Sequence, residues 1–176
     1  MENICAICHK KGLGCCLFKK NSDSQQIGIF IDDINKIANF LKVEMEYFVA
    51  KDEINDYLKD FLLSTPYPLF DKIFHNNIRY KLKTVDEKCI FLTDKGCELP
   101  LNIRPLFCRV YPFWPSKNFQ HIYVLSSSDC LAQEKSTLKW EIVNNHFNYS
   151  KEYLVNLFFE MKTSGDNHIS ALSTKP

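Results

Sequence analysis

The eight cysteines constrain this chain more than any other feature, and four of them crowd into the stretch CAICHKKGLGCC at residues 5 to 16. A chain of 176 residues can bury an ordinary hydrophobic core, so it needs no covalent staple merely to fold. The thiols therefore need a chemical explanation. They stand at Cys5, Cys8, Cys15, Cys16, Cys89, Cys97, Cys108 and Cys130.

The compartment decides how these thiols are interpreted. The first residues, MENICAICHKK, lack a basic stretch followed by an apolar run, and no apolar window is long enough to cross a bilayer. Lys and Arg number 22 against 21 Asp and Glu, so the net charge of +1 predicts neither a nucleic-acid nor a membrane partner. We therefore expect a soluble, cytoplasmic protein. A reducing cytosol does not keep structural disulfides, so the cysteines indicate metal binding.

The pattern along the chain predicts helices at both ends of a strand-bearing middle. Apolar residues recur at helical spacing from residue 31 to about 62, with Asp32 or Asp33 placed to cap the start. The segments IRYKLKT, KCIFLT and HIYVL read as short strands, with a turn at 94–96. A helical stripe follows at Leu138, Ile142 and Val143.

A final helix is predicted behind a Ser150 cap, and the polar sequence beyond Gly165 predicts a tail. With neither repeat nor low-complexity tract, the expected fold is α+β: a small cysteine-rich metal-binding domain with short strands and loops around the site, flanked by helices. We assign residues 1–132 to the cysteine-cluster metal-binding domain, 133–164 to a helical segment packed on it, and 165–176 to a flexible tail.

The cysteine spacing favours a site built from both ends of this domain. Two residues between Cys5 and Cys8 let both thiolates turn toward one ion, as in zinc knuckles and iron-sulfur loops. Adjacent Cys15 and Cys16 differ, because successive side chains of an extended backbone point to opposite faces. Either these two serve different centres, or one binds metal and the other packs. We expect the N-terminal and central cysteines to converge.

All eight cysteines are candidate metal ligands. They suffice for two four-cysteine sites, or for one centre with spare thiols, and sequence order does not divide them. The alternative is that several are buried small apolar residues, since cysteine is often fully buried. His9, inside the first motif, is either an imidazole ligand or a surface residue, and with eight sulfurs at hand we expect the surface role.

Read together with the N-terminal cluster, CIFLTDKGCELPLNIRPLFCRVYPF resembles the YkgJ-type cysteine-cluster family (CxxCxxCC), a zinc- or iron-chelating domain. The family pattern is C-x2-C and a paired CC, a helical segment, C-x-F/L-L, a second cysteine, R-P-x-x-C-R and a last cysteine. The matching positions here are Cys5, Cys8, Cys15, Cys16, Cys89 with Phe91 and Leu92, Cys97, Arg104-Pro105, Cys108-Arg109 and Cys130.

The resemblance covers roughly residues 3 to 132, and the insert HKKGLG makes the gap before the paired cysteines longer than is common in the family. Related members are the flagellin lysine-N-methylases, which are longer chains. For them the family implies an iron-sulfur cluster and transfer of a methyl group from S-adenosylmethionine to lysine side chains.

Arg104 and Arg109 bracket Cys108 and are the predicted cofactor-binding residues. A guanidinium beside a thiolate lowers the pKa of that thiol and offsets part of the negative charge of a multi-thiolate centre. The alternatives are that one arginine holds a substrate carboxylate in a bidentate fork, or that both pair with local acids.

These features favour an intracellular metal-binding protein whose cysteines hold an iron-sulfur cluster, narrowly preferred for an all-thiolate set, or zinc. Its activity would be redox chemistry or lysine methyl transfer with S-adenosylmethionine, with a protein as substrate. The alternative is a non-enzymatic, zinc-stabilised adaptor, or a metal-handling protein that passes its ion to a client. Whether the protein is an enzyme stays open at this point.

Overall fold

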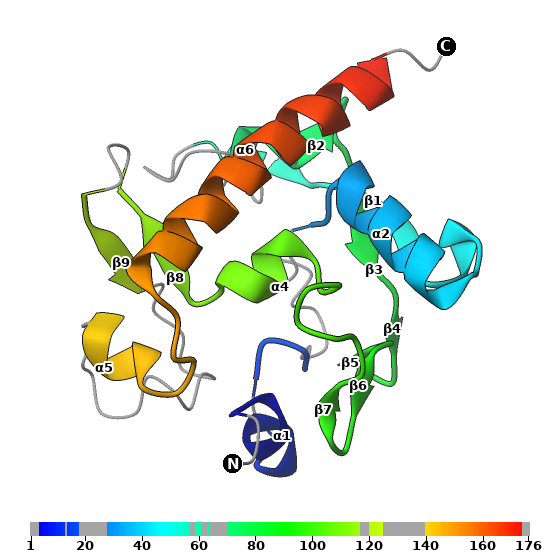
Figure 1. The fold of residues 1–176 in the computed structure, drawn as a ribbon. Coiled ribbons are helices and arrows are strands. Elements are labelled where there is room, and N and C mark those ends of the chain that lie inside the picture. Colours follow the sequence, from blue (N-terminus) through cyan, green and yellow to red (C-terminus); the bar gives the residue numbers. More distant parts are fainter. Residues whose placement is uncertain are drawn as a thin grey trace.

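The computed structural model describes residues 4–12, 14–17, 28–56, 59–60, 63, 70–116, 120–124 and 140–173. These residues form helices and small antiparallel sheets, which confirms the α+β class (Figure 1). The helices are α1 (Ile4–Lys10), α2 (Ile31–Leu41), α4 (Leu106–Val110), α5 (Trp140–Asn144) and α6 (Lys151–Ser173), with 3-10 turns η2 (Met45–Tyr47) and η3 (Phe70–Lys72).

The largest sheet has three antiparallel strands, and its central strand β3 (Ile78–Leu82) lies between β1 (Val49–Glu53) and β2 (Phe74–His75). The buried Arg79 of β3 donates to the Asp52 carboxylate of β1 from Nη2 at 2.6 Å and from Nε at 3.0 Å. A buried guanidinium needs such a partner, so this pair fixes which residue of β1 faces β3.

Three short hairpins follow along the chain: β4 (Thr84–Val85) with β5 (Lys88–Cys89), β6 (Leu92–Thr93) with β7 (Gly96–Cys97), and β8 (Phe113–Pro115) with β9 (Ile122–Val124). The strands expected from IRYKLKT and HIYVL are confirmed as β3 and β9, and KCIFLT divides between β5 and β6. The turn expected at residues 94–96 joins β6 to β7, and Gly96 there has a positive φ of 95°. Two of the predicted metal ligands, Cys89 and Cys97, thereby sit on hairpin strands.

The single helix expected from residue 31 to about 62 is wrong beyond Leu41. Lys42 takes a left-handed conformation with φ of 56° and ends α2, as helix C-caps often do. The chain then enters β1, whose pairing with β3 overrides the apolar helical spacing of the segment. Helical backbone returns at residues 56, 59, 60 and 63.

Helix α6 crosses the molecule and packs against α2 and α4 (Figure 1). The predicted Ser150 cap is confirmed, because its Oγ accepts the N–H of Tyr153 at 3.0 Å. The polar tail expected beyond Gly165 is instead helical to Ser173, because that part of the helix still has an inward face. His168 on this face is fully buried, and its Nδ1 accepts the N–H of Ile31 at 3.1 Å.

Two groups of buried apolar residues fill the interior. One joins α4, β8, β9, α5 and α6, and Trp114 stacks on Phe107 within it. The other joins α2, β1, β3 and the hairpin that ends at Cys89, and Cys16 and Cys97 pack against it. The sequence segments that carry these cysteines are thus anchored to the second core.

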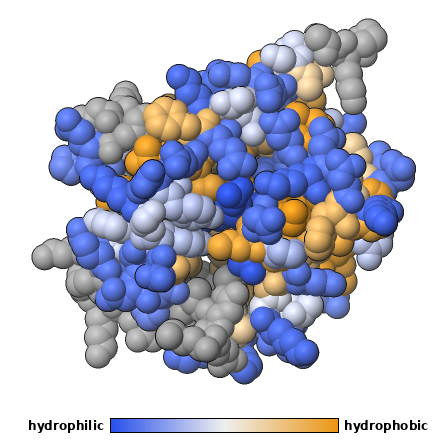
Figure 2. Space-filling view, in the orientation of Figure 1, coloured by the Kyte–Doolittle hydropathy of each residue, from blue (hydrophilic) through white to orange (hydrophobic). Residues whose placement is uncertain are grey.

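The outer surface is mixed in polarity. Figure 2 shows hydrophilic residues over most of the face in view, with apolar residues between them. The exposed large apolar side chains in the described ranges come from separate elements: Phe40, Tyr47, Leu63, Val85, Leu101, Tyr123 and Phe159. Within the same ranges, none of the helices has the length and apolar character needed to cross a membrane.

Asp33 joins α2 to α4, the helix that carries Cys108. Its carboxylate accepts the N–H of Leu106 at 3.0 Å, at the start of α4, and the N–H of Phe30 at 3.2 Å. Burial raises the pKa of Asp33 to about 7, with the Glu160 charge adding to the rise, while the two backbone donors and Lys36 oppose it. One carboxyl therefore sets the position of two helices.

The buried Asp33 carboxyl should make folding depend on pH. The folded protein keeps this proton up to about pH 7, whereas an unfolded chain releases it near 3.8, so Asp33 stabilises the fold less as pH rises through that window. Relative to Asp33→Asn, the wild-type protein should lose up to about 4 kcal/mol between pH 4 and 7, at about 1.4 kcal/mol per pKa unit.

Urea unfolding at several pH values measures this difference. Acid-sensitive groups that both proteins share, including the buried His168, cancel in the comparison because each contributes equally to both curves. Parallel curves for wild type and Asp33→Asn would show that the folded carboxyl titrates normally.

Candidate functional site

Two parts of the chain that lie far apart in the sequence, the N-terminal segment and the central hairpins, meet around the cysteines. The N–H of Cys89 donates to the carbonyl of Cys16 at 2.9 Å, and Leu17 pairs with Lys88 in an antiparallel bridge. Helix α1 packs against β7, the strand that ends in Cys97 (Figure 1). Backbone contacts therefore hold the N-terminal segment against the central hairpins.

The thiols of Cys15, Cys16 and Cys89 form a row joined by hydrogen bonds, with Cys16 in the middle. The hydrogen bond from Cys16 lowers the pKa of Cys15 and of Cys89, while the same bonds raise the pKa of Cys16 well above its usual range. A thiol has one hydrogen, so Cys16 donates to one of these neighbours at a time. None of the three is joined to another in a disulfide.

Cys97 and Cys108 complete the group. Burial raises the pKa of Cys97, and the Cys89 and Cys15 thiolates raise it further. Cys108 reaches solvent, but the protein around it raises its pKa well above the usual range, and the thiolates of Cys15, Cys89 and Cys97 add to the rise. We call Cys15, Cys16, Cys89, Cys97 and Cys108 the thiol cluster. It confirms convergence for the paired N-terminal cysteines, whereas the convergence expected for Cys5 and Cys8 stays a prediction.

The two predicted arginines lie in different surroundings. The Arg104 charge adds to the lowering of the Cys15 pKa and opposes the rise of the Cys97 pKa, and Arg104 Nε donates to the Leu99 carbonyl at 2.9 Å. The buried Arg109 instead places Nη1 at 3.3 Å from both carboxylate oxygens of Glu160 on α6. The low pKa expected for Cys108 beside these arginines is wrong, because burial and the neighbouring negative charges raise that pKa.

The remaining predicted ligands divide between α1 and the undescribed part of the chain. Cys8 is buried on α1, and a Cβ built on Gly14 would stand 3.2 Å from the Cβ of Cys8. Gly14 has a φ of 121°, so the loop before the paired cysteines passes close to the helix. Cys5 belongs to α1 by its backbone, its side chain is outside the description, and Cys130 lies outside the described residues.

The paired cysteines depart from the extended geometry assumed for them. The N–H of Leu17 donates to the carbonyl of Gly14 at 3.1 Å, so Cys15 and Cys16 occupy a turn. A turn does not send successive side chains to opposite faces as a strand does. Their thiols consequently hydrogen-bond to each other, and both can face one site.

The donor chemistry of the thiol cluster fits a soft metal, because thiolates are the ligands that zinc and iron-sulfur clusters take. The side chains are not in a closed shell: among the described residues, no three His, Cys, Asp or Glu side chains are arranged to hold a metal ion together. A metal would have to draw the sulfurs inward by rotation about their Cα–Cβ bonds, which have three staggered positions.

His9 is not the surface residue that the sequence suggested. Its side chain is 13% exposed, and its Nε2 lies 3.2 Å from Oδ1 of Asp94 in the turn between β6 and β7. Its Nδ1 is buried and has no hydrogen-bond partner within the described part of the chain. The one signal in the sequence was the position of His9 directly after Cys8.

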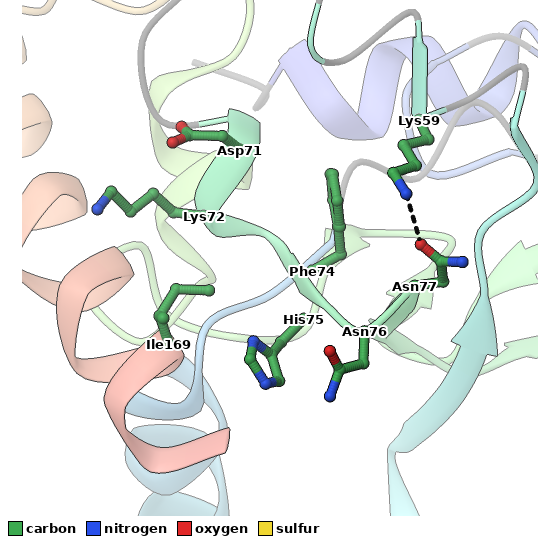
Figure 3. Close-up of a pocket in the computed structure, with 8 residues that line it drawn as sticks. All are labelled: Lys59, Asp71, Lys72, Phe74, His75, Asn76, Asn77 and Ile169. Atoms are coloured by element: carbon green, nitrogen blue, oxygen red, sulfur yellow. Dashed lines mark hydrogen bonds between the residues drawn. The ribbon is translucent and has the colours of Figure 1, made fainter. Parts of the chain in front are cut away.

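A separate pocket is lined by residues of η3, β2, the β2–β3 turn and α6, and no cysteine is among its lining residues (Figure 3). Its volume is about 640 Å³. Lys59 points across it and donates to the side-chain oxygen of Asn77 at 2.9 Å, while Lys72 is held by Asp166 at 2.6 Å. The lining residues are Lys59, Asp71, Lys72, Phe74, His75, Asn76, Asn77 and Ile169.

The hydrogen bond from Cys16 should control the reactivity of the exposed Cys15. Cys16→Ala removes the donor, which raises the pKa of Cys15 and lowers its thiolate fraction, so alkylation of Cys15 should slow several-fold. Cys16→Ser keeps a hydroxyl donor and should slow it less. Timed iodoacetamide labelling of reduced, chelator-treated protein, read by peptide mass spectrometry, measures the rates; equal rates in all three proteins would contradict the hydrogen-bonded row.

Comparison of the chain with protein-family models, with curated proteins and with solved structures finds no match.

Proposed function

We propose that this protein is a metal-binding protein whose thiol cluster holds an iron-sulfur cluster or zinc. The observation that carries the proposal is the convergence of Cys15, Cys16, Cys89, Cys97 and Cys108 from three segments of the chain. Buried cysteines scattered through a core would pack singly against apolar side chains. Here the thiols of Cys15, Cys16 and Cys89 hydrogen-bond to one another, and the charges of Cys15 and Cys89 act on both Cys97 and Cys108.

Electrostatics supports a cation at this place. Burial raises the pKa of Cys108 and of Cys97, and repulsion from the neighbouring thiolates raises both further. A divalent ion offsets the repulsion, because metal ions bind the deprotonated thiolate and release its proton. Four thiolates around one such ion leave two negative charges in excess, and the Arg104 guanidinium beside Cys15 and Cys97 offsets part of that excess.

The chemistry that follows depends on the metal. As an iron-sulfur cluster, the centre would support redox chemistry, or the methyl transfer from S-adenosylmethionine to a protein lysine that the resemblance implies. We propose the cytoplasm as its compartment, since neighbouring thiols stay reduced there. The cysteines of the thiol cluster would bind the metal centre, and Arg104 would lie beside it.

A zinc-stabilised adaptor or metal-handling protein is the second candidate, and the connections around the cluster favour it. The segment at 14–17 reaches the hairpins through a turn, one bridge and one backbone hydrogen bond. A metal that joins these pieces would contribute directly to folding. In that case the centre holds the surface in shape for a client protein.

Anaerobic purification with metal and sulfide analysis and an absorption spectrum tests the proposal. We expect stoichiometric metal, with an absorption band at about 400 nm if the centre is an iron-sulfur cluster. Cys108→Ser and Cys16→Ser should each lower the metal content, whereas Val85→Ser, an exposed position on the neighbouring hairpin, should not.

Two outcomes would reject the proposal. One is a protein that retains no metal and accepts none on reconstitution with zinc, or with iron and sulfide. The other is metal content that stays the same in both cysteine variants. Stoichiometric zinc without sulfide would retain the metal site and leave the adaptor as the function.

A further inference from the structure

His9 is placed between the surface and the interior of the site region. Its Nε2 faces the fully exposed carboxylate of Asp94, whereas its Nδ1 is buried. The two nitrogens of one ring thus meet opposite environments, so the ring is oriented with Nδ1 inward. Helix α1, which carries His9, packs on β7, which carries Cys97.

The contact with Asp94 decides which nitrogen carries the hydrogen. A carboxylate only accepts hydrogen bonds, so Nε2 must donate at the 3.2 Å contact. In a neutral imidazole the other nitrogen then has an unprotonated lone pair. Among the residues that the structure describes, no donor reaches Nδ1, which is therefore a buried acceptor left unpaired, and such a group is unfavourable.

In the sequence, His9 stands next to candidate sulfur ligands. Cys8 precedes it directly and is buried, and Cys5 stands one helical turn before it. The loop that leads to Cys15 passes against Cys8 at Gly14. A histidine that binds metal through one nitrogen usually donates the other N–H to a carboxylate, which is the pattern of His9 and Asp94.

We propose that His9 is a metal ligand through Nδ1, and that Asp94 is the positioning residue that fixes its ring. This inference rests on the proposed metal function. The cysteine spacing alone predicts a ligand shell of sulfur only, and His9 adds one nitrogen to it. With zinc, the result is a three-sulfur, one-nitrogen site. With an iron-sulfur cluster, an imidazole in place of a thiolate raises the reduction potential.

Nitrogen-15 NMR of the histidine rings tests the assignment directly on the 20.6 kDa chain, with zinc alone as the probe. In metal-free protein the His9 ring should show Nε2 protonated and Nδ1 unprotonated. Addition of one equivalent of zinc should shift the Nδ1 resonance and leave the exposed His121 and His146 rings unchanged. A buried water in place of the metal would leave Nδ1 unmoved by zinc, and this result would overturn the proposal.

Cobalt substitution separates the inference from the function it rests on. Wild-type protein loaded with Co²⁺ should show thiolate-to-metal charge transfer, with ligand-field bands at shorter wavelength than an all-sulfur site gives. His9→Gln should move those bands or weaken Co²⁺ binding about ten-fold or more, Asp94→Ala should weaken binding less, and His146→Gln should match wild type. If wild type shows charge transfer and His9→Gln has the same spectrum and Co²⁺ affinity, His9 is not a ligand but the thiolate site stands. If wild type shows no charge transfer, both the His9 ligand and the thiolate metal site are rejected.

Discussion

The backbone contact between the paired cysteines and the β5 strand is the constraint on which the proposed site depends. The hydrogen bond from the Cys89 N–H to the Cys16 carbonyl, with the bridge of Leu17 to Lys88, brings an N-terminal turn beside hairpins that lie more than seventy residues away in the sequence. This contact places Cys16 beside Cys89. The chain entropy lost in closing so long a loop is one reason that a metal bridging both sides would stabilise the fold.

A second set of contacts positions α4, the helix that carries Cys108. Asp33 on α2 accepts the first N–H of α4, and Arg109, the residue after Cys108, lies against Glu160 of α6. These two interactions fix both the start and the rotation of a helix only five residues long, which could not hold its conformation alone. Arg109 thus acts in the packing of α4 on α6, and Arg104 is the guanidinium that faces the thiols.

Local patterns predicted those parts of the fold in which one element decides its own structure. The Ser150 cap, the turn at 94–96 and the strand at 78–82 follow from residue types alone. The helix expected across 42–53 is wrong because β1 exists only by pairing with β3. The end of α6 was missed because the burial of His168 depends on Phe30, the residue before α2, and on Tyr80 of β3. Contacts of that range have no signature in local spacing.

The candidate site shows the same division. Cysteine spacing predicted convergence, but the turn at 14–17 that puts Cys15 and Cys16 on one side, and the buried Nδ1 of His9, depend on packing between α1 and the hairpins. The order of the cysteines also could not distinguish Arg104 from Arg109, because their roles differ only through the presence of Glu160 on α6.

X-ray absorption at the metal edge tests most directly the claim that these cysteines share one metal centre. For bound zinc we expect a ligand shell dominated by sulfur at about 2.3 Å, with one nitrogen at a shorter distance from the metal. The sulfur contribution should fall in Cys16→Ser and in Cys108→Ser, although these residues come from different segments of the chain. A shell of oxygen and nitrogen alone, or a sulfur shell that neither substitution changes, would contradict a metal centre shared by these cysteines.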